Sequence, residues 1–192
     1  MFRWTAPIFK LAASRWSVDD FRVIAGWLRP FLPPGGILMD LGGGTGDLGV
    51  GVAHELGCSV VVVDSSPQML ARVTGQPFVS VSLALAERLP FLNGHFDAVV
   101  CSDAFHHFRD PGAAVAEIRR TLRPGGGVVM LELDGGGLGH ILALIERLLG
   151  EPATFRSPLQ LQHYLEARGI VGTTTRRRGI SYSFVGAVSR QQ

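Results

Sequence analysis

Residues 37–49, ILMDLGGGTGDLG, and residues 58–64, CSVVVVD, decide the fold of this chain. The first stretch is a short apolar run that ends in a glycine-rich turn, and the second is built around four consecutive valines. Short, nearly continuous apolar runs are typical of strands that are buried on both faces of a sheet. A helix is expected between them over 47–55, with Gly57 closing it. The two stretches therefore predict a β-α-β unit with parallel strands.

The same alternation continues along the rest of the chain. Apolar periodicity predicts further helices over 17–29, 66–73, 111–122, 138–149 and 157–168, further strands over 78–83, 95–102, 128–133, 171–178 and 181–188, and a turn over 124–127. Strands that alternate with helices indicate an α/β fold, a doubly wound sheet with helices on both faces. Only Gly179 and Ile180 separate the last two strands, so they are expected to pair antiparallel. The prediction is a mostly parallel sheet with an antiparallel C-terminal strand.

Length and composition fit a single globular domain. The chain has 192 residues, of which 46% are apolar and 18% charged, enough for a sizeable core. The net charge of +2 is too small to indicate a nucleic-acid partner. Charge is uneven, at +3 over 1–36, −5 over 37–150 and +4 over 151–192. An acidic middle between basic ends is either a chance result of an arginine-rich composition or a sign of what the two parts bind.

Targeting and redox signals favour a cytoplasmic location. Arg3, Lys10 and Arg15 interrupt the N-terminal stretch, which has no apolar core of a secretory signal. No apolar run approaches the ~18 residues that a membrane span needs. Cys58 and Cys101 both lie in apolar runs, so we expect buried reduced thiols and neither a disulfide nor a metal site.

The glycine-rich turn is the first candidate binding element. In doubly wound sheets, ligands bind at the carboxyl ends of strands, and here the first strand ends in DLGGGTG at 40–46. Glycines let the backbone approach a ligand closely and leave a helix N-terminus free to meet it. The second strand ends in Asp64, eighteen residues past Gly46, and a carboxylate there can accept both hydroxyls of a ribose. The pattern predicts a nucleoside ligand.

Asp40 indicates whether this nucleoside ligand is a dinucleotide or a cationic nucleoside. Residues 44–49 also match the G-x-G-x-x-G fingerprint of dinucleotide sites. However, a pyrophosphate against this turn would be repelled by Asp40. An acid in that place suits a cationic ligand, such as S-adenosylmethionine with its ammonium group and sulfonium.

Five blocks then carry a family resemblance: ILMDLGGGTGDLG, VVVVDSSPQML, LAERLPF, HFDAVVCSDAFHHFRDP and LRPGGGVVMLELD. In this order and spacing they resemble the class I S-adenosylmethionine-dependent methyltransferases, in the group that includes the ubiquinone and menaquinone methyltransferases. The resemblance covers roughly residues 20–188. It implies a Rossmann-like seven-stranded sheet whose last strand is inserted antiparallel. It also implies S-adenosylmethionine as cofactor, S-adenosylhomocysteine as product, and in-line methyl transfer to a small-molecule acceptor.

The resemblance implies a set of cofactor-binding residues. They are Asp40, Gly42, Gly43, Gly44 and Gly46 at the methionine end, Asp64 and Ser65 at the ribose, Met69, Ala86 and Glu87 near the adenine, and Ser102 at the mouth of the cleft. For several of them a structural role is the alternative: the glycines can form a tight turn, Asp64 can cap a helix and Met69 can belong to the core. The family often carries an aspartate where this chain has Leu85, so backbone contacts and apolar packing are expected to hold the adenine.

Asp103, His106 and His107 are the candidate catalytic residues. They follow the fourth predicted strand, and imidazole titrates near neutrality. A base is needed only if the acceptor must lose a proton, because the cofactor is already activated and the protein mainly aligns the reactants. The alternative is that the histidines only support the local structure.

The acceptor is expected to be apolar or aromatic. Residues 1–16, MFRWTAPIFKLAASRW, are interpreted as a lid or a docked helix, with membrane-surface contact a less favoured alternative, and 17–192 as the core fold. Arg176–Arg178 are interpreted as part of a charged edge strand. Two other functions stay open: a nicotinamide-dependent oxidoreductase, and an inactive methyltransferase-like binding module, for which Leu85 is the only support.

Overall fold

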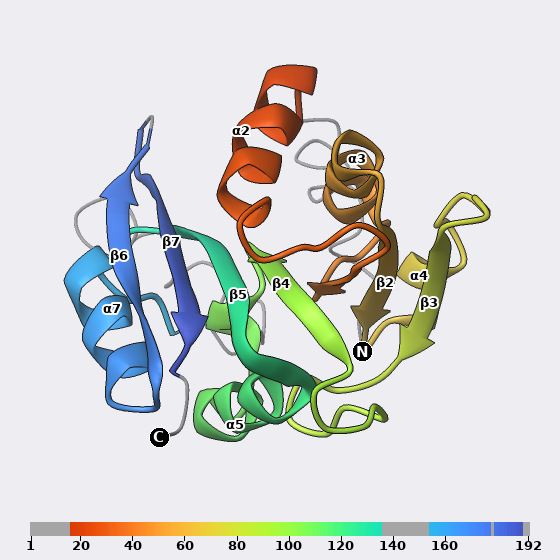
Figure 1. Ribbon diagram of the computed structural model, residues 1–192. Helices are drawn as coiled ribbons and strands as arrows, with labels where there is room; N and C mark the ends of the chain where they lie inside the picture. The colour runs from red at the N-terminus through yellow and green to blue at the C-terminus, as the bar shows by residue number, and fades with distance from the viewer. Residues whose placement is uncertain (1–15, 136–153, 178, 190–192) are drawn as a thin grey trace.

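The computed structural model describes residues 16–135, 154–177 and 179–189, which build one mixed sheet between helices (Figure 1). The strands stand in the order β3-β2-β1-β4-β5-β7-β6. They are β1 (Ile37–Leu41), β2 (Ser59–Asp64), β3 (Val79–Leu83), β4 (Phe96–Ser102), β5 (Leu122–Leu133), β6 (Ile170–Arg176) and β7 (Ser181–Val188). Neighbours among the first five strands are parallel, and β7 runs antiparallel between β5 and β6. This confirms the predicted sheet with its antiparallel C-terminal strand.

Helices cover both faces of the sheet, as predicted. Within the described residues the helical elements are α2 (Val18–Leu28), α3 (Asp47–Leu56), α4 (Pro67–Leu70), the 3-10 turn η1 (Phe105–His107), α5 (Pro111–Thr121) and α7 (Pro158–Glu166). Helices α2 and α3 lie together on one face and share a buried cluster with β1, β2, β4 and β5 (Figure 1). Helices α5 and α7 pack into the second cluster, on the other face. Both faces of the parallel strands are therefore buried, which is why their sequences are continuously apolar.

Local signals set the helix ends. Ser17 caps α2, its hydroxyl accepting from the Asp20 backbone while the Asp20 carboxylate accepts from the Ser17 backbone. Gly57 ends α3 with a φ of 65°, a left-handed conformation that suits glycine. These ends lie within one residue of the predicted ones.

Two predictions meet a different outcome, and a third is not tested. The predicted helix 66–73 is a single turn, α4, because Gly75 and Pro77 follow it closely. The predicted turn 124–127 lies inside β5, where residues 123–126 stand opposite Asp97 alone as a bulge. The predicted helix 138–149 lies outside the described residues.

The strand order places the site. It reverses between β1 and β4, whose carboxyl ends point to the same edge as those of β2 and β5. Ligands of doubly wound sheets bind at such a switch point. The glycine-rich turn leaves β1 at this edge, and η1 follows β4 there.

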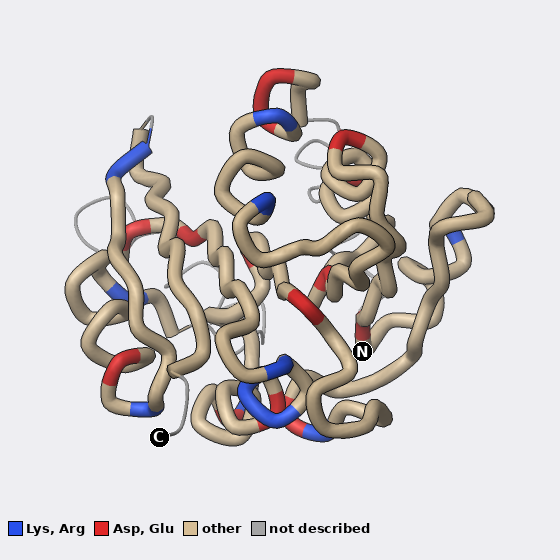
Figure 2. Tube along the Cα trace, viewed as in Figure 1, with Lys and Arg blue, Asp and Glu red and all other residues tan. Residues whose placement is uncertain are grey.

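The basic C-terminal part meets acids from the rest of the chain. Figure 2 shows basic residues at the end of β6, which is the edge strand as predicted. Arg176 pairs with Asp134 at 2.9 Å, and Arg177 pairs with Asp20 at 3.1 Å. The uneven charge along the sequence is thus partly compensated in three dimensions.

Candidate functional site

The glycine-rich turn after β1 packs closely against its own neighbours. Gly42 has a φ of 70°, and a Cβ added there would lie 2.5 Å from the Cβ of Ala104. Gly44 has a φ of 56° and leaves more room, with the Met69 Cε 3.4 Å from an added Cβ. Backbone N–H groups of Gly42 and Gly43 donate to the Val63 carbonyl, at 2.8 and 3.2 Å. The turn therefore requires glycine for its conformation and for the approach of η1.

Asp40 lies beneath this turn. Its side chain is 1% exposed, and its Oδ2 accepts from the Gly49 N–H at 3.0 Å. A Cβ added at Gly43 or Gly49 would come within 2.5 Å of the carboxyl group, so the backbone closes over it. Burial, opposed by the Gly49 hydrogen bond and assisted by the charges of Asp64 and Asp47, raises the pKa of Asp40 to about 7. A cation bound above the turn would favour the ionised form.

Asp64 ends β2 beside the same turn. Its Oδ2 accepts from the Gly44 N–H at 2.9 Å and its Oδ1 from the Ser66 N–H at 2.8 Å. Ser65 follows it, and Met69 lies against Gly44. The structure thus brings the predicted ribose residues to the glycine turn, and Asp64 also orders the start of α4.

The predicted adenine block lies between β3 and β4. Ala86 is buried, while Leu85 is 52% exposed. The Glu87 carboxylate accepts from the backbone N–H groups of Arg109 and Asp110, at 2.9 and 3.2 Å. Glu87 therefore ties this block to the segment before α5, a structural role that the sequence does not reveal.

Ser102 and Asp103 stand at the end of β4. The Ser102 hydroxyl donates to Asp103 Oδ2 at 3.3 Å, and the Asp103 N–H donates to the Leu131 carbonyl at 2.8 Å. Asp103 has a φ of 48°, the only positive φ of a non-glycine residue among the described residues. Such left-handed residues cost conformational energy and cluster at functional sites.

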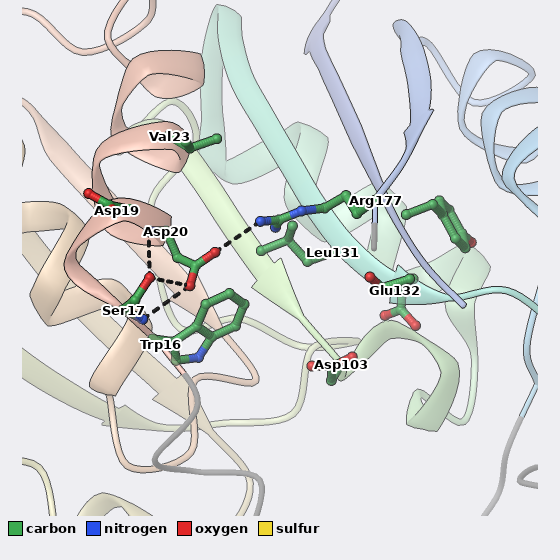
Figure 3. Close-up of a pocket in the computed structure, with 11 residues that line it drawn as sticks. Trp16, Ser17, Asp19, Asp20, Val23, Asp103, Leu131, Glu132 and Arg177 are labelled. Carbon is green, nitrogen blue, oxygen red and sulfur yellow. Dashed lines mark hydrogen bonds and ion pairs between the residues drawn. The ribbon is translucent and has the colours of Figure 1, made fainter. Parts of the chain in front are cut away.

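A cavity of about 580 Å³ opens over the carboxyl ends of β4 and β5. Its walls come from the start of α2, from the ends of β4 and β5 and from the β6–β7 hairpin. The lining residues are Trp16, Ser17, Asp19, Asp20, Val23, Asp103, Leu131, Glu132, Arg177, Ser181 and Tyr182. Figure 3 shows Asp20 and Arg177 pointing toward one another across one part of the cavity. Asp103 and Glu132 lie in another part of it.

His106 forms a buried pair that the sequence analysis did not find. Its Nδ1 lies 2.6 Å from Glu132 Oε2, and each side chain is 4% exposed. His107 lies beside it, with ring centroids 4.1 Å apart. Glu132 was missed because its partner is far along the chain. The available signal was a lone acid among the aliphatic residues of VVMLEL, at the end of a buried strand.

The two halves of the site are contiguous. Ala104, whose Cβ approaches Gly42, directly follows the cavity residue Asp103. The glycine turn and the Asp64 carboxylate fit a ligand with a ribose and a cationic tail, since they offer close backbone approach and negative charge. Among the described residues there is no group of three potential metal ligands. None of the described helices is long and apolar enough to cross a membrane.

These features are those of an α/β domain whose glycine turn fits a nucleoside. Comparisons with known proteins identify its family. A methyltransferase domain family matches residues 39–130. The ubiquinone/menaquinone biosynthesis C-methyltransferase UbiE of Cupriavidus necator is 38% identical over 145 residues, which are 67% of this chain and 60% of that protein. The chain thus spans about 60% of the length of this curated relative.

Solved structures agree on the fold. A putative methyltransferase bound to the Trm112 activator, from Haloferax volcanii, has a TM-score of 0.77 at 18% identity over 88% of this chain and 89% of that one. The 4+2 cyclase SpnF has a TM-score of 0.75 at 17% identity over 92% of this chain and 83% of that one. The chain thus belongs to the class I S-adenosylmethionine-dependent methyltransferases.

Proposed function

We propose that this chain methylates a ring carbon of a small hydroxylated aromatic molecule. The observation that carries the proposal is the continuity of the glycine turn with the cavity of about 580 Å³, through Asp103 and Ala104. A volume of this size suits a small molecule. UbiE of Cupriavidus necator and of Bordetella parapertussis, two curated relatives of this chain, are C-methyltransferases of ubiquinone/menaquinone biosynthesis, which supports an aromatic acceptor and a carbon nucleophile.

The cofactor half is assigned to the residues around the turn. Asp64 would hold the ribose hydroxyls, Gly42–Gly46 would approach the methionine end, and Asp40 would oppose its positive charge from below. Met69 and Ala86 would flank the adenine, with Ser65 and Ser102 at the edges. When bound, S-adenosylmethionine supplies an electrophilic methyl group whose bond to sulfur breaks with its electron pair remaining on sulfur.

The acceptor half is assigned to the cavity. Trp16, Val23, Leu131 and Tyr182 offer apolar and aromatic surface to a ring, and carboxylates offer hydrogen-bond acceptors to its hydroxyl groups. The expected apolar or aromatic acceptor is thus refined to one that also carries hydroxyls. The lid and docking interpretations of 1–16, of which 1–15 lie outside the described residues, stay predictions, as does a cytoplasmic location.

The fold alone does not select this chemistry, because SpnF shares it and is a cyclase. The relatives identified by sequence are methyltransferases, so methyl transfer is favoured over cyclisation, nicotinamide chemistry and an inactive module.

Calorimetry and a methylation assay test the proposal together. The protein should bind S-adenosylhomocysteine and not NAD. Asp64→Asn should weaken the binding of S-adenosylhomocysteine by about tenfold or more, because charge-assisted hydrogen bonds to the ribose are lost. With tritiated S-adenosylmethionine and 1,4-dihydroxynaphthalene kept reduced by dithiothreitol, label should appear on a ring carbon. Binding of NAD alone, or no transfer to any of a panel of naphthalenediols and benzenediols, would contradict the proposal.

A further inference from the structure

Glu132 presents a buried carboxylate to the cavity from the end of β5. It lines the cavity although only 4% of the residue is exposed. Its Oε1 accepts from the Phe105 N–H at 2.9 Å, and its Oε2 lies 2.6 Å from the Nδ1 of His106. Two hydrogen bonds from η1 therefore hold the carboxylate in one orientation, and each oxygen keeps a further lone pair for another donor.

The imidazole of His106 is itself firmly placed behind this carboxylate. Its ring stacks on Phe155, with centroids 4.2 Å apart and planes inclined by 22°. The His106 carbonyl accepts from the Thr154 N–H at 2.9 Å. An ionised Glu132 can only accept hydrogen bonds. With Glu132 ionised, the donor is therefore the N–H at Nδ1 of His106, and Oε2 of Glu132 accepts from it. In other enzymes, hydrogen-bonded pairs of a carboxylate and an imidazole orient reactive groups. In this pair, the carboxylate lies on the cavity side.

Two other ionisable groups lie near Glu132 on the cavity wall. Tyr182 stands opposite it in the β5–β7 register, and its hydroxyl donates to the Arg156 carbonyl at 3.1 Å. Burial and the charge of Glu132 raise the pKa of Tyr182 well above its usual range, so the phenol keeps its proton and is not a base. Asp103 lines the cavity from the end of β4.

We propose that Glu132 accepts the hydroxyl proton of the methyl acceptor, and that His106 is the positioning residue that holds Glu132. This inference rests on the proposed function, and it assigns the catalytic contact to a residue other than the predicted His106, His107 and Asp103. The structure supports Glu132 in place of His106 as the group that contacts the acceptor, because Glu132 lines the cavity and His106 lies behind it.

The proton balance of the step is complete. The ring carbon beside the hydroxyl bonds to the methyl carbon, the former methyl–sulfur electron pair stays with sulfur, and the hydroxyl proton passes to Glu132. The hydrogen on the newly methylated carbon then leaves to water as a proton, and Glu132 returns its own proton to the oxygen. One proton is released overall, and the aromatic ring is restored.

The isosteric variant Glu132→Gln separates this role from a structural one. Glutamine can still accept from Phe105 N–H and contact His106 Nδ1, but it cannot take up a proton. We expect kcat with 1,4-dihydroxynaphthalene to fall by about 100-fold or more, the usual loss for a general base, with S-adenosylhomocysteine affinity within about twofold. The matched control is Glu117→Gln, a glutamate that also accepts a backbone N–H, from Leu89, but lies outside the site. Full activity of Glu132→Gln would overturn the proposal.

A binding measurement tests Glu132 independently of turnover. In the complex with S-adenosylhomocysteine, the wild type should bind 1,4-dihydroxynaphthalene about tenfold more tightly than 1,4-dimethoxynaphthalene, which has no hydroxyl to donate. Glu132→Gln should lose most of that preference. Equal binding of both compounds by the wild type, or an unchanged preference in the variant, would overturn the inference. A wild type that shows the preference but methylates no diol would contradict only the proposed function.

Rescue at position 106 tests the positioning role. The amide of His106→Asn can donate to Glu132 from near the place of Nδ1, whereas His106→Ala removes the donor. In His106→Asn, we expect kcat to fall by less than about tenfold. In His106→Ala, it should fall as far as in Glu132→Gln. Both variants should retain their affinity for the cofactor. Equal losses in both variants would show that the donor is not what His106 supplies.

Discussion

Replacing Asp40 by asparagine should stabilise the cofactor-free protein above neutral pH. The carboxyl group is 1% exposed, and burial raises its pKa to about 7. Asparagine is close in shape and keeps an oxygen that can accept from the Gly49 N–H, now at 3.0 Å. The substitution therefore removes the cost of a buried charge while it keeps the turn in place.

The magnitude follows from proton linkage. In the unfolded chain the pKa of this carboxyl group is near its ordinary value of 3.8, so between that pH and about 7 only the folded state holds the proton. Unfolding then releases a proton, and the stability contributed by this group falls as the pH rises. One unit of pKa corresponds to ~1.4 kcal/mol, so the stability of the wild type relative to Asp40→Asn should fall by about 3 kcal/mol between about pH 5 and pH 8.

Urea denaturation at the two pH values, followed by tryptophan fluorescence, measures this difference. Asp47→Asn, in the exposed first turn of α3, controls for the general loss of a negative charge. A free-energy difference between wild type and Asp40→Asn that stays constant from pH 5 to pH 8 would refute the reasoning. As a second readout, the stabilisation by S-adenosylmethionine should grow over the same range in the wild type and not in the variant.

Three further predictions concern packing, charge and thiol reactivity. Gly42→Ala should lower the free energy of unfolding, measured in urea titrations, by about 1–3 kcal/mol more than Gly57→Ala. Both glycines have a positive φ, but an added Cβ meets a side chain within 4 Å only at Gly42. Arg177→Gln should cost less than about 1 kcal/mol, and less still at high salt, because its ion pair with Asp20 is partly exposed; a larger loss would contradict this. Burial raises the pKa of the Cys101 thiol, so its reaction with Ellman's reagent should be slow until urea unfolds the chain.

The sequence signals were most informative where they were local. The apolar strands and the helix ends near Ser17 and Gly57 are read from neighbouring residues, and the structure confirms these two helix ends within one residue. The bulge in β5 was not predicted, because residues 123–126 are accommodated through pairing with β4 and the ion pair of Arg123 with Asp97 at 2.9 Å. That pairing depends on a partner strand and has no local signature.

The candidate site divides in the same way. Asp40, the glycine turn and Asp64 belong to one β-α-β unit, so their proximity follows from the order of strand, helix and strand. Glu132 and His106 belong to different elements, 26 residues apart, and their contact at 2.6 Å arises because β5 lies beside β4. A lone acid at the end of a buried strand was a signal, but nothing in the sequence named its partner.

The sequence by itself determined the fold class and the residues of the predicted nucleoside half of the site, because hydrophobic period, turn glycines and strand-end acids act over short stretches of chain. Only the tertiary structure decided which residues form the cavity, the proposed acceptor half. The cavity is closed by residues as distant as Asp20 and Arg177, separated by 157 positions, and by the side chains that end β4 and β5. Which of these groups face one another depends on strand order and on the antiparallel insertion of β7, and these are properties of the packed sheet.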